Sequence, residues 1–91
     1  MTTAIKVRVT RAMIQRGERG VPSCCPVALG MFEAIPDVRS VVAYPNGLYW
    51  NNGGVEHGIN TPDAAANFMR AFDAGKPVKP FTFMLRTEPP P

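Results

Sequence analysis

The chain has 91 residues, enough for one small domain and too few for a second hydrophobic core. Its formal net charge is +3, and the excess lies near the start, where residues 1–20 hold five cations against Glu18 alone. No run of apolar residues approaches the length of a membrane span, which is about 20 residues. Cations interrupt the apolar residues at the start of the chain, so this segment does not resemble a signal peptide. We therefore expect a cytoplasmic protein with reduced cysteines and no membrane contact.

The first third of the chain predicts a strand followed by two helices. Residues 4–10 alternate between apolar and polar side chains, which is typical of a half-buried strand. Thr10 can cap a short helix over residues 11–16, which Gly17 would end. Pro26 suits the first turn of a second helix that stops before Pro36. This helix is apolar on every side except at Glu33, so we expect it to be buried all round, or covered in part by a second copy.

The remaining chain predicts a meander, a helix and a last strand. Residues 38–44 are rich in β-branched side chains, and turn signals at 45–47 and 51–54 separate short strands at 48–50 and 55–59. Thr61 is placed to cap a helix that runs to Ala74, and residues 81–86 form the last strand. We predict one α+β domain over residues 1–86, with a mixed or antiparallel sheet of about four strands and two or three helices on one face. Residues 87–91 form a disordered, proline-rich tail.

Two segments resemble a known group of proteins. The segments "RGERG…CPVALGMFEAIPD" and "FMRAFDAGKPVKPFTFMLR" together cover about half of the chain. They are similar to a family of small, uncharacterised proteins of bacteriophages and actinobacteria, with a CPVAL-type helix start and an FDxGxPVxPFxF carboxy-terminal segment. The resemblance implies a phage or prophage accessory protein, and it brings no catalytic residues with it.

The adjacent cysteines, Cys24 and Cys25, allow several interpretations. A thiol at a helix start has a lowered pKa, which would suit a nucleophile, but the single histidine, His57, is far away in sequence. Two neighbouring cysteines and one histidine are a poor set of ligands for zinc. A disulfide between neighbouring cysteines would be strained. We expect packed cysteines at the start of a buried helix, with no metal and no cofactor.

Two clusters remain as candidate binding sites: a basic cluster within residues 6–19, and an aromatic middle segment within residues 44–57. The basic cluster could neutralise phosphates or meet an acidic protein surface, or it could consist of ordinary solvated charges. The aromatic middle segment could hold a partner or a small ligand, or it could fill the core while its asparagines make turns. Strand alternation sends Tyr49 and Trp50 to opposite faces, and likewise Glu56 and His57. The basic cluster comprises Lys6, Arg8, Arg11, Arg16 and Arg19, and the protein-binding candidates are Tyr44, Tyr49, Trp50, Asn51, Asn52 and His57.

Taken together, these patterns favour a non-catalytic phage or prophage accessory protein that acts as a protein-binding module. Its partner would be a host protein or a second copy of the chain in a homodimer. The first alternative is a nucleic-acid-binding protein that uses the basic amino-terminal face. The second is a cysteine-dependent thiol enzyme.

Overall fold

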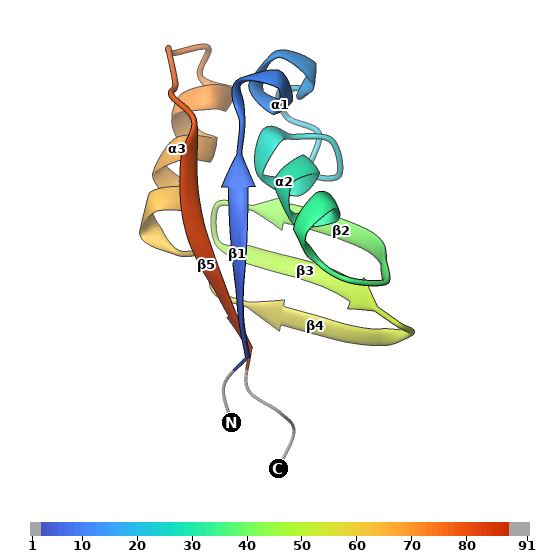
Figure 1. Ribbon diagram of the computed structural model, residues 1–91. Helices are drawn as coiled ribbons and strands as arrows, with labels where there is room; N and C mark the ends of the chain where they lie inside the picture. Colours follow the sequence, from blue (N-terminus) through green and yellow to red (C-terminus); the bar gives the residue numbers. More distant parts are fainter. Residues whose placement is uncertain (1–2, 88–91) are drawn as a thin grey trace.

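The strands of this protein form two antiparallel sheets that pack together with three helices (Figure 1). The computed structural model describes residues 3–87. The α+β class predicted from the sequence is confirmed, but the expected single sheet is replaced by two. In chain order the elements are β1 (Thr3–Val9), α1 (Arg11–Arg16), α2 (Pro26–Ala34), β2 (Val38–Tyr44), β3 (Gly47–Asn52), β4 (Val55–Ile59), α3 (Asp63–Asp73) and β5 (Phe81–Thr87).

The first and last strands pair with each other in a two-stranded ribbon. β1 and β5 run antiparallel, with Val7 opposite Phe83. Helix α2 lies on the side of β1 away from β5 (Figure 1), where Gly30 approaches the strand so closely that a Cβ on it would sit 2.8 Å from the Arg8 carbonyl oxygen. Among the described residues, no third strand pairs with this ribbon. The other strands form a separate sheet in the order β2-β3-β4.

The core lies between the inner faces of the two sheets, with α2 and α3 at its sides. In β1, β2, β3 and β5 it takes alternate residues, as the hydrophobic pattern predicts. Complete burial of each large aliphatic side chain contributes about 1.5–3 kcal/mol. The central residues are Val7, Val9, Val27, Met31, Leu48, Trp50, Met69, Phe83 and Leu85, all less than a tenth exposed.

The predicted cap of α1 and the predicted bounds of α2 are confirmed, and the predicted cap of α3 is wrong. The Met13 amide donates to the Thr10 hydroxyl at 3.3 Å, which closes the first turn of α1. Helix α2 begins at Pro26 and ends before Pro36. Thr61 does not cap α3, because its hydroxyl donates to the Tyr44 carbonyl at 2.6 Å and so ties the end of β2 to the segment before that helix.

Further differences from the sequence-based prediction concern exposure and strand ends. The side chain of Phe32 on α2 is 55% exposed, so the helix is not buried all round within one chain. β3 extends beyond the predicted residues 48–50 at both ends, and Thr87 belongs to β5. The rest of the predicted tail, residues 88–91, lies outside the described residues. In the part of the chain that the structure describes, no helix is both long and apolar enough to cross a membrane.

Candidate functional site: an aromatic shelf and an adjoining cavity

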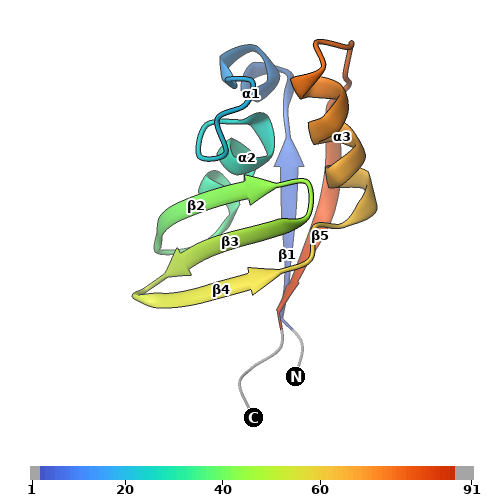
Figure 2. The ribbon, with the colours of Figure 1, turned by 180° about the vertical axis from the view of Figure 1, so that it is seen from behind.

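The outer face of the three-stranded sheet, which is turned towards the viewer in Figure 2, carries two exposed tyrosines. Tyr49 is 48% exposed, whereas its neighbours Leu48 and Trp50 are 0% and 2% exposed. Strand alternation therefore separates Tyr49 from Trp50, as predicted. Tyr44 leaves the end of β2 on the same face, where it is 42% exposed.

Two glycines let the Tyr49 ring lie flat on the sheet. Gly58 is the cross-strand partner of Tyr49 on β4, and Gly47 precedes Tyr49 by two residues on β3. A Cβ on Gly58 would lie 2.9 Å from Cδ1 of the ring, and one on Gly47 would lie 2.5 Å from the tyrosine hydroxyl. Any side chain at either glycine would collide with the ring in this position. We call Tyr44, Gly47, Tyr49 and Gly58 the aromatic shelf.

The two tyrosine rings of the shelf contact each other edge to face. Their centroids are 6.3 Å apart and their planes meet at 67°. Such pairs contribute about 0.5–1.5 kcal/mol beyond the area they bury. The Thr61 hydroxyl holds the backbone of Tyr44 in addition. These contacts hold the two tyrosines in place without a partner. The binding of a partner to the shelf therefore costs little side-chain conformational entropy.

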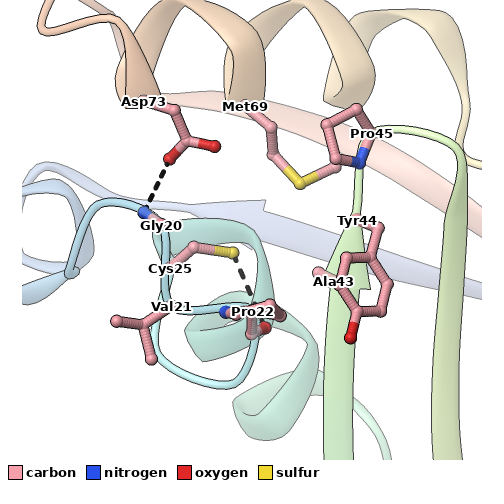
Figure 3. Close-up of a pocket in the computed structure, with 9 residues that line it drawn as sticks. All are labelled: Gly20, Val21, Pro22, Cys25, Ala43, Tyr44, Pro45, Met69 and Asp73. Carbon is pink, nitrogen blue, oxygen red and sulfur yellow. Dashed lines mark hydrogen bonds between the residues drawn. The ribbon is translucent and has the colours of Figure 1, made fainter.

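A half-open cavity of about 250 Å³ adjoins the shelf, and Tyr44 belongs to both (Figure 3). Its walls come from three separate elements: the loop before α2, the end of β2, and α3. The sulfur atoms of Cys25 and Met69 face the space between these elements (Figure 3). The lining residues are Gly20, Val21, Pro22, Cys25, Ala43, Tyr44, Pro45, Met69 and Asp73.

Hydrogen bonds hold the loop that forms one wall of the cavity. The Gly20 amide donates to Oδ1 of Asp73 at 3.1 Å, which attaches the loop to the end of α3. The Ala43 amide donates to the Pro22 carbonyl at 2.9 Å, which attaches the same loop to β2. The Cys25 thiol also faces the Pro22 carbonyl, with sulfur and oxygen 3.9 Å apart. The cavity is therefore a fixed part of the fold, and the carboxylate of Asp73 stands at its rim.

The start of a helix is expected to lower the pKa of the Cys25 thiol, but the structure indicates the opposite change. Burial raises the pKa of the Cys25 thiol, and the charge of Asp73 adds to this, while nearby backbone amides oppose it less strongly. A lowered pKa was the condition for nucleophilic use of this cysteine. His57, which the sequence places far from the cysteines, is likewise absent from the residues around Cys25 that line the cavity, because it stacks on Trp50 with ring centroids 5.3 Å apart.

The other residues of the predicted aromatic site help to build the fold. Trp50 is buried in the core, which removes it from any partner surface. Asn51 donates to the Glu56 carboxylate at 2.9 Å and accepts from the Gly54 amide at 2.9 Å, so it shapes the β3–β4 turn. Asn52 donates to the Pro36 carbonyl. Of the candidates, Tyr44 and Tyr49 are the ones left exposed for binding.

The predicted basic cluster is divided among several parts of the surface. Lys6 and Arg8 are exposed on the outer face of the β1–β5 ribbon, as strand alternation predicts. Arg11 donates to the Val78 carbonyl at 3.4 Å, and Arg16 lies beside Phe32 on α2. Arg19 extends towards Gly75, where a Cβ would come within 3.5 Å of its guanidinium. The structure thus brings two of the five cations together.

Sequence reasoning missed the cavity and one cation of the ribbon. Met69, Pro45 and Asp73 belong to elements far from Cys25 in the chain, so no local pattern connects them. Arg86 joins Lys6 and Arg8 only because β5 pairs with β1. Because Phe81, Phe83 and Leu85 share one face of the last strand, alternation places Arg86 on the other face. The sequence does not show which strand pairs with this one.

Comparison with known proteins gives no match: no protein-family model, no curated protein and no solved structure corresponds to this chain. The phage-family resemblance therefore stays a prediction from its motifs.

Proposed function

We propose that this protein is a non-catalytic protein-binding module, whose partner surface is the aromatic shelf with its adjoining cavity. The observation that carries the proposal is the pair of exposed tyrosines, Tyr44 and Tyr49, held in one arrangement against backbone glycines. Rigid tyrosines offer a large contact area at a small loss of side-chain entropy, and they are enriched among the residues that dominate binding energy.

The cavity supports a protein partner over a free small molecule. At about 250 Å³ it is below the about 300–1,000 Å³ of typical small-molecule sites, and its lining is mainly apolar. A space of this kind suits one apolar side chain of a partner, inserted beside Tyr44 between Ala43 and Met69. We infer that the partner lays a chain segment over the two tyrosines and anchors that side chain in the cavity. The predicted phage origin would make this partner a host protein.

The experiment is affinity capture with nuclease-treated bacterial lysate, followed by a binding measurement with the captured protein. Truncation of a dominant interface residue costs about 2 kcal/mol or more, which is about 30-fold in affinity. We expect the Tyr44→Ala/Tyr49→Ala variant to lose at least about 30-fold, because both anchors of the surface are removed.

The matched control is Phe32→Ala, which removes an aromatic side chain of similar exposure from the surface of α2. This variant should retain full affinity. Sedimentation of the purified protein, alone and as the tyrosine variant, distinguishes a second copy from a different partner. A partner that binds the tyrosine variant unchanged, or that is lost with Phe32→Ala instead, would contradict the proposal.

A further inference from the structure

We propose that the outer face of the β1–β5 ribbon is a second binding site, for the phosphate backbone of duplex DNA. This face lies on the opposite side of the molecule from the aromatic shelf, as Figures 1 and 2 show together. The proposal is independent of the protein-binding function, since the two surfaces share no residue. It rests on the strand register, which brings cations from both ends of the chain onto one exposed face.

The strand register determines which side chains share the outer face. Val7 and Val9 are buried, so the alternate residues of β1 point outwards, and their partners on β5 do the same. The three cross-strand pairs on this face are Ala4 with Arg86, Lys6 with Met84, and Arg8 with Thr82, and all six residues are exposed. Three of these described residues are cations and none is an anion. Lys6, Arg8 and Arg86 form what we call the cationic ribbon.

The spacing of the cationic ribbon suits a polyanion. Successive outward residues of a strand are about 6.8 Å apart, so the three cations extend along the ribbon at short intervals. Duplex DNA carries one negative charge per about 1.7 Å of its axis, so several phosphates face a surface of this length. Between the ribbon and α2 there is a hollow of about 310 Å³, lined in part by Lys6 and Arg8, with room for a phosphate group.

The character of the face favours a duplex over a single strand. Proteins that hold unpaired bases stack them on exposed aromatic rings. The aromatic residues of β5 point the other way: Phe83 is 6% exposed, and Phe81 packs on Phe68 with ring centroids 4.8 Å apart. Lysine and arginine side chains on a strand face can contact phosphates without reading bases. The expected binding is therefore independent of sequence and strongly dependent on salt.

One carboxylate opposes this binding and offers a test of its location. Glu33 on α2 lines the same hollow as Lys6 and Arg8. Its negative charge repels a phosphate placed there, so Glu33→Gln should strengthen DNA binding by about twofold, the size of one exposed charge interaction. Glu56 lies on the other sheet, where it accepts from Asn51, and Glu56→Gln removes the same charge at a distance from the ribbon.

The experiment measures fluorescence anisotropy of a short labelled DNA duplex of mixed sequence, titrated with the full chain at several salt concentrations. Three phosphate contacts predict a slope of log K against log salt of about −2.7. This slope corresponds to about a 40-fold loss of affinity between about 50 and about 200 mM salt. Lys6→Gln, Arg8→Gln and Arg86→Gln should each reduce the slope by about 0.9 and the affinity at 50 mM by about 15-fold. Arg39→Gln, an equal charge change at an exposed residue of β2, should leave the slope unchanged.

Several outcomes would overturn the proposal. One is the absence of duplex binding at low salt, and another is an equal loss in Arg39→Gln and the ribbon variants, which would indicate an effect of net charge alone. Stronger binding to the single strand than to the duplex would also count against it. Vesicles of phosphatidylcholine and phosphatidylserine serve as a further probe, and binding to them without retention of the duplex would assign the ribbon to an anionic membrane surface instead.

Discussion

The two sheets have the same kind of inner face and very different outer faces. Both turn valine, leucine or aromatic residues into one shared core. The three-stranded sheet exposes the two tyrosines of the aromatic shelf, whereas the β1–β5 ribbon exposes Lys6, Arg8 and Arg86. In a strand the inward residues are constrained by packing and the outward ones are not. The outer faces are therefore the places where this small fold can carry separate binding functions.

The two outer faces also differ in how tightly their side chains are packed. On the shelf, the Tyr49 ring packs on the backbone at Gly47 and Gly58, and a side chain at either position would collide with it. On the outer face of the ribbon, the residues of the three outward cross-strand pairs are all exposed. A rigid aromatic surface suits a partner of defined shape, while long flexible cations suit a repetitive polyanion.

The largest expected effect tests whether the two faces act independently. The triple variant Lys6→Gln/Arg8→Gln/Arg86→Gln should lose about 3,000-fold in duplex affinity near 50 mM salt, because all three phosphate contacts are removed. Its affinity for the captured protein partner should stay unchanged. Conversely, Tyr44→Ala/Tyr49→Ala should bind the duplex normally. Anisotropy titrations of both ligands with both variants check this, and a loss of both ligands in either variant would show that the faces are coupled.

A smaller effect tests the packing of the shelf. Gly58→Val should lower the free energy of unfolding by about 1–3 kcal/mol, because its side chain takes the space of the Tyr49 ring. In a Tyr49→Ala background the same substitution should cost almost nothing, since the ring is absent. Thr82→Val on the ribbon, where the side chain is exposed, should change stability by less than about 0.5 kcal/mol. Urea denaturation of the wild type and the four variants measures these effects, and an equal loss from Gly58→Val in both backgrounds would contradict this packing of Tyr49.

The smallest effect concerns the thiol beside the shelf. Burial raises the pKa of Cys25 above its ordinary value, so the folded protein keeps this proton at a pH where the unfolded chain has released it. The unfolded state is then favoured as the pH rises above about 8.5, where an ordinary thiol ionises, and the free energy of unfolding should fall. Cys25→Ala should show a shallower decline in urea denaturation between about pH 7 and about pH 10. Parallel profiles for Cys25→Ala and wild type would refute the raised pKa.

The sequence by itself determined the local elements, because their causes are local. Alternation predicted β1 with Lys6 and Arg8 outwards, Thr10 predicted the cap of α1, and Pro26 and Pro36 bounded α2. The turn signals predicted the meander, and strand period predicted that Tyr49 and Trp50 would separate. The Thr61 cap of α3 failed as a prediction because the threonine hydroxyl bonds to a strand that local reasoning did not place beside it.

Only the tertiary structure decided which elements meet, and both candidate sites depend on this. The cavity needs the loop before α2, the end of β2 and α3 together, and the cationic ribbon needs the pairing of the first strand with the last. The close packing of Gly30 on β1 likewise joins two segments that are distant in the chain. Such contacts arise from the packing of distant segments into one core. No pattern within a few neighbouring residues contains that information, because each segment could pack in several ways until the whole domain selects one.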